Sequence, residues 1–470
     1  MRLRGALYTL ASLVISYGFL ISTGPRSTVI RSVYDVVDRT AWHNATARPP
    51  VVLVLVVLGW SIVVDRCRRA GIRLELVLGP GPILPARAIF RSAIILLNSI
   101  LLSHLVHFVV ERRDGPSRPW YLVCDVLLHV MIICVFLSPP ALATALARRP
   151  SDAAFDEVSK STRGTQRAKM CVLDDDPRDV VARSQQLPEG KGVLYPEARA
   201  GLARALRDTL AAPFAPVTFW HVVVADYATS LAKALADLQI TACVATRAFA
   251  FRNVRSSDDL YDLYKPECAA SLANAIALGL PFWCRLAQCL RVFSDAGERK
   301  NLVNALKYST ALPLVVAGYL QKHATSDAAL NAATRFLIAA AVLNSSFSFA
   351  WDVVMDWGIL RPKRPKILLA SRSRLAVLAS YLLLLAFNLT MRFAWAIAVF
   401  SHASTQNYGM FALEAVEVLR RTVWAVFRIE FEYITKGLPL AFPSSSSHVK
   451  LVPEDKEALL RADYQRGSPR

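Results

Sequence analysis

The sequence predicts an all-α, polytopic membrane protein with about ten transmembrane helices. Hydrophobic residues make up 54% of the 470 positions. The mean hydropathy is +0.35, on the apolar side of ordinary globular composition. The apolar residues gather in runs that approach the roughly 20 residues needed to cross about 30 Å of hydrocarbon. These observations exclude an ordinary soluble domain.

Basic residues exceed acidic ones, 55 Lys and Arg against 36 Asp and Glu, which gives a net charge of +19. In a soluble protein this excess would suggest a nucleic-acid partner. Here it concentrates between apolar runs, at 66–73 and at 361–374, and the second cluster contains no acid. The positive-inside rule makes that face cytosolic, so we expect no nucleic acid. With ten crossings, both termini are cytosolic as well.

Four spans are predicted within residues 1–147. They lie near 7–22, 51–64, 88–110 and 120–147. The first directly follows Arg2 and Arg4 and could instead be a signal peptide. The sequon at Asn44 falls in a predicted lumenal loop, where glycosylation is feasible. Residues 148–215 are polar and predict a cytosolic loop with helical structure only near its end.

Six further spans and a cytosolic tail at 434–470 are predicted in the second half. The spans lie near 216–243, 267–293, 302–322, 332–356, 375–400 and 410–433. The eight cysteines show no paired spacing of a zinc site. Five of them lie within or at the ends of apolar spans and are interpreted as membrane-core thiols: Cys124, Cys134, Cys243, Cys284 and Cys289. The chain shows no phosphate loop and no nucleophile elbow. We therefore expect no enzyme, no catalytic residue, no metal and no cofactor.

Several polar and ionisable side chains fall inside these spans. An ionised residue at mid-bilayer costs about 2.5–3.5 kcal/mol on insertion scales, so it usually faces a bundle interior or an aqueous path. Asp226 and Thr229 share one helical face, and so do Asp352 and Asp356. The candidate site residues are Asp226, Thr229, Lys307, Tyr308, Asp352, Arg392, Trp395, Arg420 and Arg421.

Two interpretations of these charges remain open. Four charged residues near the span ends are expected to form structural salt bridges or to snorkel: Asp356, Arg428, Glu430 and Glu432. The doubled Arg420 and Arg421 need more counter-charge than a single carboxylate supplies, and a bound anion would supply it. Guanidinium groups pair bidentately with phosphate, and a carboxylate accepts the proton of monohydrogen phosphate. Sulfate would bind too, so spacing favours an anion path more than any one anion.

Five ordered motifs resemble the EXS domain. They are PFWCRLAQCLR at 281–291, NALKYS at 304–309, WDVVMDWG at 351–358, RFAW at 392–395 and RRTVWAVFRIE at 420–430. The resemblance covers 216–433 and implies a six-helix carboxyl-terminal bundle. The family includes eukaryotic phosphate exporters and the fungal ER-retention-defective proteins.

The resemblance implies a location and a function. The exporters carry a long cytosolic SPX domain before the first span, whereas this chain starts its first span at once, which points to the fungal ER-retention-defective branch. That branch resides in the Golgi membrane. We therefore expect transport of inorganic phosphate, released by lumenal glycosylation, from the Golgi lumen to the cytosol. The branch is also tied to glycosyltransferase recycling and to retention of lumenal ER proteins.

The family's phosphate site carries over residue by residue. It comprises Asp226, Lys307, Tyr308, Asp352, Arg392, Arg420 and Arg421, with Trp395 near a gate. Thr229 stands where the exporters usually have Asn, Leu306 stands where Gly is common, and Val292 follows Arg291 in place of a second Arg. The Thr229 departure bears on affinity or selectivity.

A non-transporting membrane adaptor is the alternative function. Its loops and tail, including the serine run at 444–447, would recruit cytosolic Golgi-recycling factors. A membrane-embedded transferase is a third reading, without any recognisable nucleophile or metal cluster. The resemblance is compatible with a homodimer. The sequence leaves open whether flux is channel-like or proton-linked.

Overall fold

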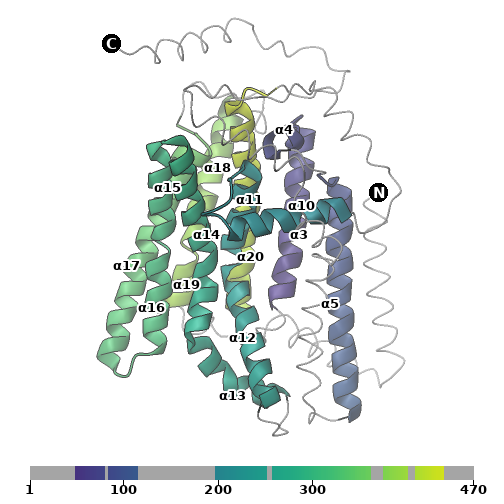
Figure 1. The fold of residues 1–470 in the computed structure, drawn as a ribbon, viewed down its shortest axis with the longest axis vertical. Coiled ribbons are helices and arrows are strands. Elements are labelled where there is room, and N and C mark those ends of the chain that lie inside the picture. Colours follow the sequence, from purple (N-terminus) through teal and green to yellow (C-terminus); the bar gives the residue numbers. More distant parts are fainter. Residues whose placement is uncertain are drawn as a thin grey trace, which may run out of the picture.

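The computed structural model describes residues 48–79, 83–114, 196–250, 257–360, 374–400 and 408–438. Every regular element within these ranges is a helix, in agreement with the all-α prediction. Most of the helices stand upright side by side (Figure 1). Helices α3 and α5 lie at one side of the bundle, and α15, α16 and α17 lie at the other.

The two long helices described within residues 1–147, α3 and α5, overlap predicted spans. Helix α3 (Arg48–Arg69) packs between α5 (Ala86–Asp114) and α20 (Tyr408–Thr435), and its last turn carries three arginines. The short α4 (Leu74–Leu78) follows at this basic end and contacts α3, α11 and α20. The spans predicted near 7–22 and 120–147, and the Asn44 sequon, lie outside the described residues.

Three of the predicted spans of the second half are each divided into two helices. The pairs are α11 (Phe219–Ser230) with α12 (Ala232–Ala250), α15 (Arg299–Ser309) with α16 (Leu312–Lys322), and α18 (Arg374–Arg392) with α19 (Trp395–Phe400). At the first two breaks a threonine hydroxyl donates to a backbone carbonyl three residues earlier: Thr229 to Asp226 and Thr310 to Lys307. Such local bonds compete with the helical ladder. The breaks therefore correct the expectation of unbroken spans at these positions.

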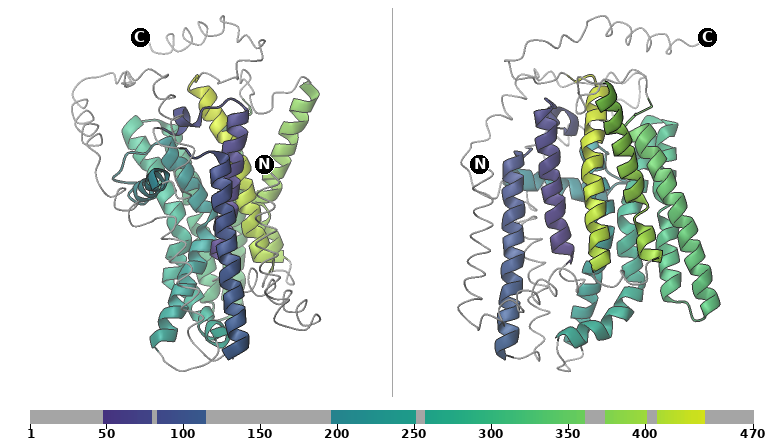
Figure 2. Two further views of the ribbon diagram at one scale, coloured as in Figure 1. Left: turned by 90° about the vertical axis from the view of Figure 1, so that its right-hand side faces the viewer. Right: turned by 180° about the vertical axis from the view of Figure 1, so that it is seen from behind.

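The remaining helices surround these broken ones. Helix α14 (Leu272–Ala296) packs against α11, α12, α15 and α16, and α17 (Asp327–Trp351) continues as the π-helical turn η2 (Asp352–Asp356). Helix α10 (Pro196–Leu210) runs across the upright helices and contacts α11 and α14 (Figures 1 and 2). Helix α13 (Ser257–Ala270) lies at the end of the bundle opposite α4 (Figure 1).

Apolar and charged side chains are distributed in the manner of a membrane protein. Leu383 on α18 is 71% exposed, whereas Asp226 and Asp352 are each 1% exposed. Four described helical stretches have the length and apolar character of membrane spans. They are Arg48–Arg69, Leu272–Ala296, Asp327–Asp356 and Ala376–Ile397. The described residues thus hold several membrane helices, and the number ten stays a prediction.

The interpretation of Cys243 as a membrane-core thiol is wrong. Cys243 on α12 and Cys268 on α13 form a disulfide, with Cα atoms 5.9 Å apart. Zinc-type spacing does not detect this pair, because the packing of α13 against α12 brings together residues 25 positions apart. Cys284 and Cys289 are free and buried, as is Cys67.

An apolar core at the α4 end fixes the helices that carry the polar residues. It contains buried side chains from α3, α4, α11, α18 and α20, among them Leu74, Tyr227, Tyr381 and Trp424. Trp357, directly after η2, is also buried there, and its indole Nε1 donates to the carbonyl of Trp424 at 3.4 Å. This packing ties η2 to α20.

Candidate oxyanion-binding site

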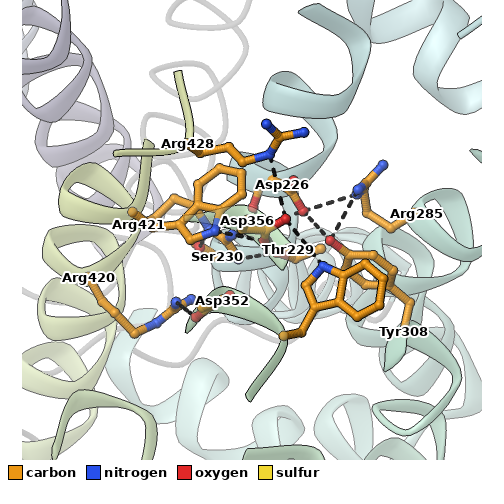
Figure 3. A network of polar contacts seen from close by, with 12 residues as sticks. Asp226, Thr229, Ser230, Arg285, Tyr308, Asp352, Asp356, Arg420, Arg421 and Arg428 are labelled. Carbon is orange, nitrogen blue, oxygen red and sulfur yellow. Dashed lines mark hydrogen bonds and ion pairs between the residues drawn. The ribbon is translucent and has the colours of Figure 1, made fainter. Parts of the chain in front are cut away.

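Asp226 is the centre of a buried polar cluster that Figure 3 shows from close by. One carboxylate oxygen, Oδ1, accepts hydrogen bonds from the Tyr308 hydroxyl at 2.6 Å and from Arg285 Nε at 3.0 Å. Arg285 Nη2 also donates to the Tyr308 hydroxyl at 3.1 Å. Helices α11, α14 and α15 therefore meet at this carboxylate oxygen.

Arg421 joins α20 to the end of α11. Its Nη2 donates to Thr229 Oγ1 at 2.9 Å, and its Nε donates to Ser230 Oγ at 3.0 Å. Ser230 in turn donates to Glu417 Oε1 at 2.7 Å. Because the helix ends at Ser230, both hydroxyls lie where one guanidinium can reach them.

Arg420, the residue before Arg421 on α20, pairs with Glu417. Its Nε and Nη2 donate to the two Glu417 oxygens at 2.8 and 2.6 Å. Its third nitrogen, Nη1, is buried and has no hydrogen-bond partner among the described residues. This nitrogen lies 3.8 Å from Asp352 Oδ2, so it remains available as a donor.

Asp352 gathers donors from α18. Asn388 Nδ2 donates to its Oδ2 at 3.0 Å, and Arg392 Nε and Nη2 approach the same oxygen at 2.9 and 2.6 Å. Arg392 is the last residue of α18, directly before the break. The break therefore places a guanidinium at the inner end of a shortened helix.

Asp356 belongs to the same cluster, although the local helix is not the α-helix that the sequence predicts. The Trp357 N–H donates to the Asp352 carbonyl at 2.9 Å, the i to i+5 bond of a π-turn. Asp356 accepts from the indoles of Trp351 and Trp424 at 3.2 and 3.0 Å. Arg428 Nε lies 3.5 Å from it (Figure 3).

The salt bridges predicted near the span ends are confirmed for Arg428. Besides Asp356, this side chain binds Glu432, with Nη1 2.9 Å from Oε2. Arg428 therefore shares its charge between two carboxylates.

Lys307 differs from the arginines of the cluster, because its ammonium makes no hydrogen bond to any described residue. Its side chain is buried, and its ammonium Nζ lies 4.2 Å from the centre of the Tyr308 ring and 5.3 Å from the Trp351 ring. Among the described residues it has neither a hydrogen bond nor an ion pair. An ammonium that contacts aromatic faces and makes no hydrogen bond keeps its three donors for another partner.

The linked side chains hold more positive than negative charge. The basic members are Arg285, Lys307, Arg392, Arg420, Arg421 and Arg428, and the acidic members are Asp226, Asp352, Asp356, Glu417 and Glu432. Buried charge without a counter-charge is costly, so a surplus of one cation favours an anion. In the described ranges, no group of three or more His, Cys, Asp or Glu residues is arranged to hold a metal ion.

The structure brings together the candidate residues chosen from the sequence. Trp395 lies beside them at the start of α19, where its Nε1 donates to Ser345 Oγ at 3.0 Å. The Ser345 hydroxyl donates to the Arg392 carbonyl at 3.0 Å. The indole is thus tied to the residue that ends α18.

Sequence reasoning missed four polar members of the cluster. These are Ser230, Arg285, Asn388 and Glu417. Arg285 lies inside one of the EXS-like motifs, and Glu417 lies one turn before Arg420 and Arg421. Charge inside an apolar span signals both residues, whereas no sequence signal distinguishes Ser230.

The fold and the cluster define a helical membrane protein with a buried, positively charged polar site between broken helices. The EXS family model matches residues 186–434, and the chain belongs to the EXS family. The match begins before the predicted 216 and so includes α10.

Three relatives illustrate the family. The chain is 30% identical over 255 residues to a xenotropic and polytropic retrovirus receptor 1 homolog of Danio rerio, 51% of this chain and 36% of the relative. It is 27% identical over 262 residues to phosphate transporter PHO1 homolog 1 of Arabidopsis thaliana (53% and 32%). It is 27% identical over 248 residues to protein ERD1 homolog 1 of Schizosaccharomyces pombe (50% and 63%). The alignments thus span less than two thirds of each relative.

Proposed function

We propose that this protein moves inorganic phosphate across the Golgi membrane from the lumen to the cytosol. It would return the phosphate that lumenal glycosylation releases, and so support glycosyltransferase recycling and retention of lumenal ER proteins. The observation that carries the proposal is the surplus of buried positive charge, with Arg420 Nη1 and Lys307 Nζ left without hydrogen-bond partners among the described residues.

The donor set suits a tetrahedral oxyanion. Guanidinium forks match phosphate oxygens, and an ammonium adds a compact charge. The nearby carboxylates Asp226 and Asp352 offer acceptors for the proton of monohydrogen phosphate, a proton that sulfate lacks at neutral pH. They also limit the positive charge of the empty site. These features favour phosphate over a fully ionised oxyanion.

Different relatives support the two parts of the proposal, phosphate as the substrate and the Golgi as the compartment. One is named a phosphate transporter, and another is named an ERD1 homolog. The Golgi assignment rests on the second likeness. The orientation rests on the positive-inside rule, which makes the basic end of α3 and both termini cytosolic. The disulfide between α12 and α13 agrees with a lumenal location for the opposite end, because disulfides persist in oxidising compartments.

The test is phosphate flux by the purified full chain in liposomes. Arg421→Ala removes two hydrogen bonds at the α11 break, and we expect radiolabelled phosphate flux to fall about 100-fold, as for loss of a buried charged partner. Arg291→Ala is the matched control, since Arg291 lies on α14 and pairs with the exposed Asp295. Equal flux in Arg421→Ala and the wild type would exclude this site.

The adaptor alternative makes a different prediction in cells. Truncation after residue 438 would disrupt retention of Golgi enzymes, while Arg421→Ala would leave it intact. Loss of retention in Arg421→Ala, with retention preserved in the truncated chain, is the outcome that a transporter requires.

A further inference from the structure

A second charged cluster lies outside the oxyanion site, where the amino-terminal parts of α3 and α20 meet α12. Arg48 opens α3 and lies 3.0 Å from Asp237 Oδ2 through Nη2, and 3.9 Å from Glu414 Oε1 through Nη1. Lys233, one turn before Asp237 on α12, binds the other Asp237 oxygen. We name Arg48, Lys233, Asp237 and Glu414 the lower cluster. It lies at the end of α3 that is opposite the basic turn.

Within the lower cluster, the two cations lie closer to Asp237 than to Glu414. Asp237, whose side chain is 0% exposed, has the close contacts of both Arg48 and Lys233. Glu414 is 6% exposed, and both of its oxygens are buried with no hydrogen bond to any described residue. A buried carboxylate in this position either recruits a cation or binds a proton. Arg48 lies closer to Asp237 than to Glu414, at 3.0 against 3.9 Å, and Lys233 pairs with Asp237.

The lower cluster is continuous with the oxyanion site. Glu414, Glu417 and Arg421 are spaced at three and seven residues on α20, so they follow one face of that helix. On that face Glu417 accepts the hydrogen bond from Ser230, the last residue of α11. Lys233 and Asp237 lie on α12, which begins two residues after Ser230. Seven residues of helix separate Glu414 from Arg421 by about 10 Å. A charge change at Glu414 therefore acts on an anion held by Arg421.

We propose that Glu414 is a proton-binding site linked to the oxyanion site, so that a proton taken up at the lower cluster strengthens anion binding. This rests on the proposed phosphate site. The proton comes from the aqueous phase on the α13 side of the bundle, attaches to a Glu414 oxygen and leaves as a proton to water. No other bond forms or breaks.

The direction of the effect follows from charge. With Glu414 ionised, the two cations and two carboxylates give the lower cluster a net charge of zero. With Glu414 neutral, its net charge is one positive charge. The charges that act on Glu414 are those of Arg48, Lys233 and Asp237. Glu417 lies one turn along α20, and Lys322 of α16 acts on Lys233 and Asp237 from the side. One added positive charge about 10 Å away strengthens anion binding on the order of tenfold at an effective dielectric constant of about 20. Linkage is reciprocal, so phosphate binding also favours proton uptake.

The experiment compares phosphate affinity at mildly acidic and neutral pH for the full chain in nanodiscs, with radiolabelled inorganic phosphate. Phosphate itself gains a proton in this range, so the wild-type profile is compared with that of Glu414→Gln, which mimics the neutral carboxyl. We expect Glu414→Gln to bind at neutral pH about tenfold more tightly than the wild type, and to lose the protein's share of the pH dependence. Glu267→Gln on α13 is the control, because that carboxylate is exposed and pairs with Arg247.

The outcomes separate the two proposals. If the wild type neither binds nor passes phosphate, the proposed function fails. If the wild type binds phosphate and Glu414→Gln keeps the wild-type affinity and pH profile, only the proton site is overturned. Should Glu414→Gln not purify as a folded protein, Arg48→Gln with Glu414→Gln removes the carboxyl together with its nearest guanidinium. The double variant keeps Lys233 on Asp237, and a wild-type pH profile in it overturns the proton site equally.

Discussion

Arg392 and Asp352 join the end of α18 to the π-turn after α17 through a single carboxylate oxygen. Arg392 Nε and Nη2 lie 2.9 and 2.6 Å from Asp352 Oδ2. Arg420 Nη1 lies 3.8 Å from the same oxygen. The carboxylate therefore faces two of the guanidinium groups that an oxyanion would use. An anion bound at the proposed site would compete with Asp352 for the same donors.

This competition predicts that Asp352→Asn binds phosphate more tightly and releases it more slowly. The amide keeps a hydrogen-bond acceptor for Arg392 while removing one negative charge. We expect affinity to rise about tenfold, equivalent to about 1.4 kcal/mol, and liposome flux to fall. Equilibrium binding and efflux of radiolabelled phosphate measure the two effects. Asp295→Asn, an exposed carboxylate paired with Arg291, should change neither. Weaker binding by Asp352→Asn would show that Asp352 serves only to hold the arginines in place.

Trp395 is expected to restrict passage at the break between α18 and α19. Its indole is tied through Ser345 to the Arg392 carbonyl, beside the oxyanion site. Trp395→Ala removes the ring and should raise phosphate flux several-fold, whereas Trp395→Phe keeps the bulk and should stay near the wild type. Trp283→Ala is the control, because that indole is 52% exposed on α14. Unchanged flux in Trp395→Ala would exclude a gate at this position.

The sequence identifies the cluster because charge inside an apolar span is costly. Asp226, Lys307 and Arg421 stand out for this reason without any knowledge of the fold. Their partners do not, since pairing is a tertiary property. The bond from Arg421 to Ser230 joins residues 191 positions apart. Arg285 is also a charged residue inside an apolar span. The sequence shows it as part of a motif and does not predict its pairing with Asp226.

Helix breaks and the disulfide limit what apolar runs can predict. Hydropathy alone predicts one span across 302–322, yet the Thr310 hydroxyl bonds to the Lys307 carbonyl and the helix restarts at Leu312. The mean hydropathy of a stretch of residues does not depend on such a local hydrogen bond. Likewise, Cys243 and Cys268 meet only because α13 folds back on α12. Both features depend on contacts that periodicity does not contain.

Gly358, directly after the π-turn, should not tolerate a side chain. Its φ of +56° lies in the left-handed region, and an added Cβ would collide with the Phe431 ring of α20. We expect Gly358→Ala to lower the free energy of unfolding by about 1–3 kcal/mol, through backbone strain and displaced packing. Gly318→Ala, on α16 with no atom within 4 Å of the added Cβ, should leave stability unchanged or raise it. Thermal unfolding of the purified variants measures both, and equal midpoints would contradict the close packing of η2 on α20.

The disulfide between Cys243 and Cys268 should contribute to stability and report the orientation of the bundle. It closes a segment of 25 residues, for which chain-entropy arguments give about 3 kcal/mol. Reductant should therefore lower the thermal midpoint of the wild type and of Cys289→Ser, a free buried cysteine, but not that of Cys243→Ser with Cys268→Ser. In sealed Golgi vesicles, an impermeant maleimide should label this pair only after reduction and only with access to the lumen. Labelling without reductant would disprove the bond, and labelling from the cytosolic side would reverse the proposed orientation.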